Sequence, residues 1–190
     1  MKTTNSLASV KLITLLALLA LVAIPATTWA AKDARLWLEG ATQGRIPNNV
    51  PTDGKTTGIK VVGFGHNVSA PYDAITGIPK NSRQHRPVRI VKDVDKTTPL
   101  LSNLMNNNEL ITSFELRFYG VDGDGADVHM YSVELLNAHV VSIMPSHSSA
   151  DAESLEIPMR ETVSFTYQRI ITTWQDGGRS SEDLWNTQSQ

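Results

Sequence analysis

The sequence predicts a mainly β domain: a small β-barrel of two packed antiparallel sheets with one short α-helix. Two observations indicate this fold. Apolar and polar residues alternate in short runs through most of the chain after residue 30, and one run near residue 100 has helical spacing instead. The 190 residues, 41% of them hydrophobic, suffice for one domain with a single core. We therefore expect one folded domain over residues 31–190.

The strands are expected where the alternation is clearest. They cover residues 35–39, 59–68, 88–90, 114–119, 131–135 with a continuation towards 143, and 163–174. Within 59–68, Val62, Phe64 and Val68 lie on one side of the strand and glycines on the other. Glycines on one face of a strand predict a bend, a barrel corner or a close backbone approach.

The strand pattern also predicts core residues and one irregularity. The residues expected in the core are Phe114, Phe118, Val163 and Phe165. In the last long strand the apolar residues change parity near Gln168–Arg169, which moves them to the opposite face. A bulge or a strand bend produces such a switch, and small barrels need bends of this kind.

The helix is expected at about 98–107. A threonine hydroxyl precedes Pro99, and proline is favoured in the first helical turn. Apolar residues then recur at helical spacing, and the residues expected to pack onto the barrel are Leu100, Leu104 and Met105. The run Asn106–Asn108 ends the helix. The other connections, at 41–57, 69–86 and 145–158, are expected to be loops.

The N-terminus has the pattern of a secretory signal peptide over residues 1–30. Lys2 and Lys11 precede an apolar run of 13 residues from Leu12 to Ile24, which is shorter than the roughly 20 residues a membrane span needs. Pro25 ends the run, and small residues then predict cleavage before Ala31. We therefore expect a secreted or periplasmic protein, extracellular on secretion, with no membrane span after cleavage.

Composition excludes several classes of function. The chain has no cysteine, which excludes disulfides, thiol nucleophiles and cysteine-based metal centres. Removing Lys2 and Lys11 from the 17 basic residues leaves 15 against 19 acidic ones, a net charge of −4 for residues 31–190. A mildly acidic domain is a poor match for the phosphate backbone, so no nucleic-acid partner is expected.

Three aspartates are the sharpest candidate for a metal site. Asp122, Asp124 and Asp127 lie on a glycine-rich stretch, and their oxygens could bind calcium. The spacing differs from that of an EF-hand, and two alternating strands flank the stretch, so an Asp-Gly hairpin turn is the favoured interpretation. No metal ligand is assigned.

The histidines and serines show no catalytic pattern either. The five histidines (His66, His85, His129, His139 and His147) include no helical pair and no HExxH motif, and they are interpreted as surface or half-buried strand residues. No GxSxG elbow is present. We therefore expect no enzyme activity, no catalytic residues and no cofactor.

Taken in order, the apolar runs form a specific pattern. They are Ala34–Gly40, Ile59–His66, Arg86–Leu100, Phe114–Tyr119, Met130–Val141 and Glu161–Ile170, followed by Trp174–Gly178 and Asp183–Trp185. The most specific parts are an Asp-x-Asp-x-x-x-Pro-Leu stretch at 93–100 and a Trp…Asp-Gly…Asp-x-Trp tail at 174–185. Over residues 33–187 this order resembles the Hcp family, the haemolysin-coregulated tube proteins of type VI secretion systems.

The resemblance implies an assembling structural protein. It implies homohexameric rings that stack into a hollow tube, contact with the type VI spike protein, and small effector proteins carried in the lumen. The family has no catalytic residues to transfer to this chain. Its long loop after the second core strand matches 69–86, and that loop projects onto a neighbouring subunit or ring. An 18-residue irregular loop needs a function or a partner, and Tyr72, Ile75 and Ile78 are its apolar residues.

The N-terminal segment departs from the family pattern. Tube proteins of this family are normally made in the cytoplasm without a signal peptide, and no methionine lies between Met1 and Met105 to supply a later start. The alternative hypothesis is therefore an exported Hcp-like binding module or adhesin that does not form tubes. The oligomeric state of the protein distinguishes the two.

Overall fold

The computed structural model describes residues 33–47, 58–80, 83–122, 125–147 and 159–185. The predicted signal peptide, 1–30, lies outside these residues. The elements, in chain order, are β1 (Asp33–Gly40), β2 (Gly44–Arg45), β3 (Ile59–Val61), β4 (Gly63–Gly65), β5 (Val68–Ser69), β6 (Gln84–His85), β7 (Val88–Asp93), α2 (Thr98–Asn106), β8 (Ile111–Val121), β9 (Asp127–Leu136), β10 (His139–Ser146), β11 (Arg160–Thr166), β12 (Arg169–Trp174) and β13 (Arg179–Leu184). The prediction of a mainly β domain with one short helix is confirmed.

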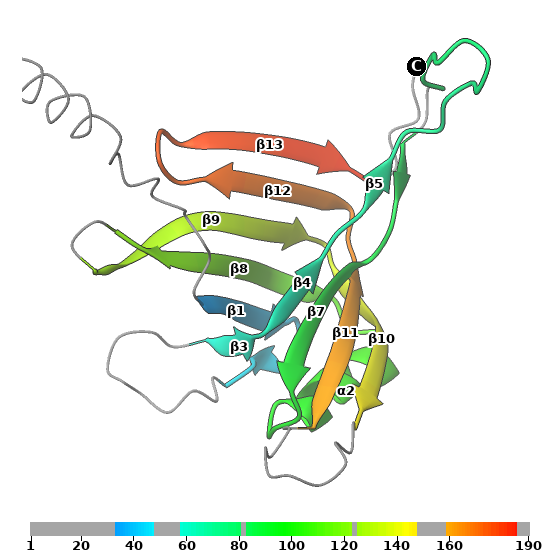
Figure 1. The fold of residues 1–190 in the computed structure, drawn as a ribbon. Coiled ribbons are helices and arrows are strands. Elements are labelled where there is room, and N and C mark those ends of the chain that lie inside the picture. The colour runs from blue at the N-terminus through cyan, green and yellow to red at the C-terminus, as the bar shows by residue number, and fades with distance from the viewer. Residues whose placement is uncertain (1–32, 48–57, 81–82, 123–124, 148–158, 186–190) are drawn as a thin grey trace, which may run out of the picture.

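The strands form three antiparallel sheets. The large sheet has the order β13-β12-β9-β8-β1-β2, with β3 also paired to β1, and the small sheet has the order β10-β11-β7-β4. The strands of the small sheet cross those of the large sheet at a steep angle, and the two-stranded β5–β6 sheet projects beyond both (Figure 1). The predicted pair of packed antiparallel sheets is therefore present.

Among the described residues the chain passes between the two main sheets at three corners, and once more through α2, which connects β7 to β8. At Val62, between β3 and β4, the backbone N–H donates to the Val91 carbonyl at 2.8 Å. At Asn137, whose φ is 50°, the chain turns from β9 into β10. At Tyr167–Gln168 it turns from β11 into β12, which confirms the bend predicted from the parity change. At this third corner the strand changes sheets, so its buried face changes too.

The predicted barrel is not closed. In the part of the chain that the structure describes, strand pairing ends at β10 and β4 in the small sheet, and no ladder joins its edges to the large sheet. The backbone runs from one sheet to the other at each corner, but the strand ladders of the two sheets end there and are not hydrogen-bonded to each other. Alternation in the sequence reports only which side of a strand is buried, and this is the same in a barrel and in an open pair of sheets.

The core fills the space between the two main sheets. Its residues include Leu36 and Leu38 of β1, and the predicted core residues Phe114, Val163 and Phe165 are all buried. The Phe114 and Phe165 rings meet edge to face with centroids 5.0 Å apart, which joins the two sheets.

One core prediction and one strand prediction need correction. Phe118 is only partly buried at the margin of the core, because its ring lies beside the corner at Val62, where the sheets separate. In the run 59–68, Ile59 and Val61 are the buried residues, whereas Val62, Phe64 and Val68 are exposed. The run is three short strands rather than one, and its side-chain alternation does not continue through the corner.

Helix α2 lies where predicted, but its N-terminus is capped differently. Thr97 occupies the N-cap without a side-chain capping bond, because its hydroxyl donates instead to the Asp95 carboxylate at 2.6 Å. Leu101 and Leu104 are the buried helix residues, while the predicted Leu100 and Met105 pack at the core's margin. The helix has nine residues, and among all the residues described no helix is long and apolar enough to cross a membrane.

Candidate assembly arm and its base

A two-stranded ribbon, here called the arm (residues 68–80 and 83–85), projects from the sheets (Figure 1). Its strands pair Val68 with His85, and a bridge between Tyr72 and Pro79 extends the pairing outward. The Lys80 N–H donates to the Pro71 carbonyl at 2.6 Å. The prediction of a loop without regular structure at 69–86 is therefore wrong for the paired part. Proline has no N–H to donate, so the hydrogen bonds between the two strands use the N–H groups of other residues. Pro71 still contributes its carbonyl as an acceptor.

The end of the arm is a turn organised by Asp73. Its carboxylate accepts hydrogen bonds from the backbone N–H of Ile75 at 3.0 Å and of Thr76 at 2.9 Å. These bonds, that of Thr76 first, lower the pKa of Asp73 because they favour the ionised carboxylate. Gly77, with φ of 70°, supplies the left-handed residue and donates its N–H to the Asp73 carbonyl. The turn has a defined shape although it is surrounded by solvent.

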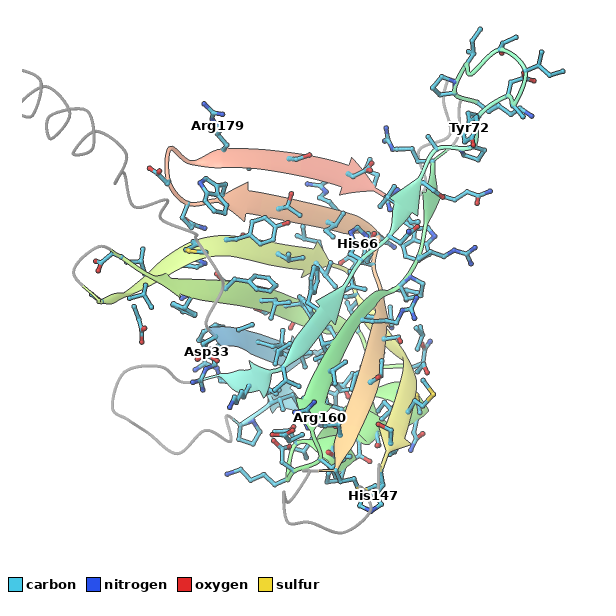
Figure 2. All side chains as sticks on the ribbon, in the orientation of Figure 1. Asp33, His66, Tyr72, His147, Arg160 and Arg179 are labelled. Carbon is cyan, nitrogen blue, oxygen red and sulfur yellow. The ribbon has the colours of Figure 1, made fainter. Side chains whose placement is uncertain are left out.

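The three apolar residues predicted for assembly all lie on this arm and are all exposed. Tyr72 is 67% exposed, Ile75 96% and Ile78 64%. Figure 2 shows Tyr72 far from the body of the two main sheets. The arm thus presents large apolar side chains on an ordered support, a combination that is typical of contact surfaces.

A chain of polar side chains lies at the base of the arm. The Tyr167 hydroxyl lies 2.6 Å from His66 Nε2 and 3.0 Å from His85 Nδ1. On the far side of His85, its Nε2 lies 3.6 Å from Asp183 Oδ2, and the other Asp183 oxygen accepts a 2.7 Å hydrogen bond from Arg83. The chain joins the arm to the corner after β11 and to β13, and Figure 2 shows His66 at this junction.

Burial sets the protonation of this cluster. Tyr167 and His85 are buried, and Trp185 packs on both, with ring centroids 5.0 and 5.7 Å away. Burial first, and then the neighbouring His85, lowers the pKa of His66, while Asp183 opposes the shift. Burial also raises the pKa of Tyr167, so its hydroxyl keeps its proton.

Sequence reasoning did not predict this cluster. It treated His66 and His85 as separate strand residues, and they meet only because β5 pairs with β6. The sequence held one indication of the cluster: the Asp-x-Trp tail contains both Asp183 and Trp185. The tail is explained by its contacts at the base of the arm.

The other specific motif surrounds a buried ion pair. The ammonium of Lys92 lies 2.8 Å from Glu161 Oε1 and 3.0 Å from Asp95 Oδ1, while Thr98 donates its hydroxyl to the same Glu161 oxygen at 2.8 Å. The Asp-x-Asp-x-x-x-Pro-Leu stretch thus joins β7, β11 and the start of α2. Its role in the described structure is to hold the helix in place.

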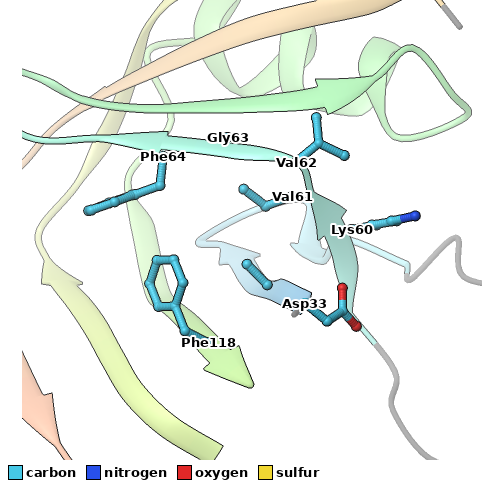
Figure 3. Close-up of a pocket in the computed structure, with 8 residues that line it drawn as sticks. Asp33, Lys60, Val61, Val62, Gly63, Phe64 and Phe118 are labelled. Atoms are coloured by element: carbon cyan, nitrogen blue, oxygen red, sulfur yellow. The ribbon is translucent and has the colours of Figure 1, made fainter. Parts of the chain in front are cut away.

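A hollow of about 510 Å³ lies beside the corner at Val62 (Figure 3). Its lining residues are Asp33, Ala34, Lys60, Val61, Val62, Gly63, Phe64 and Phe118. Phe64 and Phe118 meet edge to face at 5.3 Å, and the lining is mostly apolar. This composition favours apolar contact rather than acid–base chemistry.

The aspartate stretch forms the predicted hairpin turn. The Asp122 N–H donates to the Ala126 carbonyl at 2.9 Å, and Asp122 Oδ1 accepts from the Ala126 N–H at 2.8 Å. Asp124, the third aspartate of the candidate calcium site, lies outside the described residues. Among the side chains that are placed, no group of three or more His, Asp or Glu could hold a metal ion.

The fold thus combines two packed antiparallel sheets, a projecting arm with exposed apolar side chains and a mostly apolar hollow. The chain matches the family model described as type VI secretion system effector, Hcp, over residues 36–174. It is 31% identical over 167 residues to the major exported protein of Pseudomonas aeruginosa, covering 83% of this chain and 97% of that protein.

Solved structures agree with this match. The secreted protein Hcp3 of Pseudomonas aeruginosa is 28% identical with a TM-score of 0.66, covering 83% of this chain and 100% of its own. A mutant form of Hcp1 from the E. coli EAEC 042 pathovar is 25% identical with a TM-score of 0.70, covering 80% of this chain and 98% of its own. The chain belongs to the Hcp family, the tube proteins of type VI secretion systems.

Proposed function

We propose that this protein acts without catalysis, as a ring subunit whose arm contacts a neighbouring subunit when rings stack. The observation that carries the proposal is the 96% exposure of Ile75 at the end of an ordered arm. Burying Tyr72, Ile75 and Ile78 against a second subunit removes apolar surface from water, which favours stacking.

The polar groups support a structural role. His66 and His85 are held by the Tyr167 hydroxyl at the base of the arm, and the Lys92–Glu161 pair is buried between strands. Each of these groups is used in joining elements of the fold. Family membership supports two further inferences about the stacked rings. We infer that the tube carries small effector proteins in its lumen and that it contacts the type VI spike protein.

Residues 1–30 support a further proposal, export through a cleaved signal peptide. The mature protein is then expected to begin at or near Ala31. Sequencing the N-terminus of exported protein tests this. Retention of Met1 would refute cleavage.

The signal-like segment also favours a second candidate function. An exported subunit leaves the cytoplasm, where tubes of this family are normally assembled, so the same fold could serve as an exported binding module or adhesin that does not form tubes. This candidate predicts a protein that is monomeric at every concentration. The first candidate predicts rings.

The experiment combines electron microscopy with sedimentation of residues 31–190. The parent protein is compared with a variant carrying Tyr72→Ser, Ile75→Ser and Ile78→Ser. We expect stacked rings for the parent and separate rings for the variant. Met144→Ser is the matched control, because Met144 is 61% exposed but lies on β10, away from the arm. Equal stacking of parent and arm variant would refute the role of the arm.

A further inference from the structure

The hydrogen-bond chain at the base of the arm has a preferred direction. A tyrosine hydroxyl donates one proton, so Tyr167 donates to one histidine and accepts from the other. Asp183 decides between the two arrangements, because His85 Nε2 must carry a proton to face the carboxylate favourably at 3.6 Å. His85 Nδ1 then accepts from the Tyr167 hydroxyl, and His66 Nε2–H donates to it. Both histidines are neutral in this arrangement.

The closed chain accommodates one extra proton but not two. With one histidine protonated, Tyr167 can turn its hydroxyl towards the other. With both protonated, two N–H groups and the O–H converge on one oxygen, and the tyrosine proton is left without an acceptor. Two positive charges then also lie within hydrogen-bonding distance of a single buried hydroxyl, which is unfavourable at low dielectric.

The surrounding charges add to this effect. Arg83, the residue before β6, already holds one oxygen of Asp183 at 2.7 Å, so the carboxylate is shared between that guanidinium and His85. A second hollow, separate from the one beside Val62, is lined by both His66 and Arg89 of β7, so Arg89 adds a positive charge there. Asp183 is thus the one carboxylate in a set that otherwise consists of two histidines and two arginines.

We propose that the chain from His66 through Tyr167 and His85 to Asp183 is an acid-sensitive anchor, which fixes the arm while the histidines are neutral and releases it when both are protonated. The proposal rests on the arm having the role given above, and it adds that the angle of the arm is under the control of pH. Tyr167 and Asp183 act as positioning residues for the arm.

The direction of the effect follows from proton linkage. Burial and His85 lower the pKa of His66 in the anchored state, whereas a released, solvated histidine has a pKa of about 6.5. The released state therefore binds protons more readily. The stability of the anchored state is complete above about pH 6.5 and declines as the pH falls below that value, towards the lowered pKa of His66.

A distance measurement between two spin labels tests the anchor directly. The chain has no cysteine, so Ile75→Cys on the arm and the exposed Ser113→Cys on β8 provide two unique attachment sites. Labelled protein is diluted into excess unlabelled protein, so that only distances within one subunit are measured. We expect a narrow distance distribution at about pH 7.5 and a broad one at about pH 5.

Two variants separate protonation from simple loss of structure. His66→Gln keeps an amide that can donate to Tyr167 but cannot be protonated, so its distribution should stay narrow at both pH values. Tyr167→Phe removes the shared hydroxyl, and its distribution should be broad at both. Tyr131→Phe, a change of the same kind on β9, should behave like the parent.

A parent distribution that is equally narrow at both pH values would overturn the proposal, and so would a His66→Gln protein that still broadens in acid. If Tyr167→Phe fails to fold, the His66→Gln result decides. The labels report the arm within one subunit whether or not rings stack. A failure of stacking therefore counts against the proposed function, and a pH-independent distance counts against the anchor.

Discussion

Lys92 and Glu161 form an ion pair of 2.8 Å with both side chains completely buried. The pair joins β7 to β11 across the small sheet, and Thr98 extends it to the first turn of α2. Such a pair stabilises a fold only while both partners are present, because the loss of one leaves a buried charge without compensation. It therefore fixes where the helix lies on the sheets.

Removing one partner should be severe. Lys92→Met should lower the free energy of unfolding by about 3–5 kcal/mol, as the Glu161 carboxylate loses its cation. Chemical denaturation measures this. Arg160→Ala is the control, because Arg160 and Asp93 form an exposed pair at 3.5 Å, and its loss should cost about 1 kcal/mol or less. Equal costs for the two variants would contradict the role assigned to burial.

The two phenylalanines expected in the core should differ in their contribution. Phe165→Ala should cost about 3–5 kcal/mol, because its ring is completely buried against Phe114. Phe118→Ala should cost less, since Phe118 lies at the margin of the core. Thermal and denaturant unfolding of both variants tests this ranking. A larger loss of stability for Phe118→Ala than for Phe165→Ala would contradict it.

Gly40 should not tolerate a side chain. A Cβ at this position would collide with the Glu109 carboxylate and Leu104, and that carboxylate accepts the backbone N–H groups of Thr42 and Gln43 at 2.6 Å. Gly40→Ala should therefore cost about 1–3 kcal/mol. Gly65→Ala is the control, because a Cβ there meets open space. A Gly40→Ala melting temperature equal to that of the control would disprove the close approach.

Acid should weaken the folded state. Burial lowers the pKa of both His66 and His129, with His85 and Arg117 respectively adding to the shift. A histidine with a lowered pKa binds its proton better when unfolded, so the stability of the fold declines as the pH falls below about 6.5, towards the lowered pKa of the folded state. The melting temperature should therefore drop between about pH 7.5 and pH 5.

Replacing these histidines should make the pH dependence shallower. His66→Gln and His129→Gln should each reduce the drop, whereas a Gln replacement of the exposed His147 should leave it unchanged. A melting temperature that rises on acidification, or a slope that neither replacement alters, is the result that counts against this assignment.

Local pattern was sufficient to predict most of the fold. The alternation around Phe114 and Phe165 indicated strands and a shared core, and the parity change at Gln168 located a corner, because burial on one side leaves a repeat of two in the sequence. Whether the two sheets close into a barrel leaves no such trace in the sequence. The run 59–68 was assigned as one strand because nothing in its pattern marks where hydrogen bonding changes from β1 to β7.

The candidate site was also predicted only in part, because some of its residues stand out in the local sequence and others are brought together only by the fold. Tyr72, Ile75 and Ile78 were identified because apolar residues in a segment rich in proline and glycine are conspicuous in any sequence. The contact of His66 with Tyr167 joins residues a hundred positions apart, and its partner His85 depends on the register of β5 with β6. Tertiary pairing sets such contacts, and no repeat in the sequence records them.

Deletion of residues 72–80 from the otherwise intact chain tests the central claim most directly. The Lys80 N–H meets the Pro71 carbonyl at 2.6 Å, so the ends of the deleted segment already lie together and the shortened ribbon can close. Electron microscopy and sedimentation of the deletion and its parent should show a folded protein whose rings persist and no longer stack. Tubes that form equally well without these residues, or a parent that stays monomeric at every concentration, would contradict the claim.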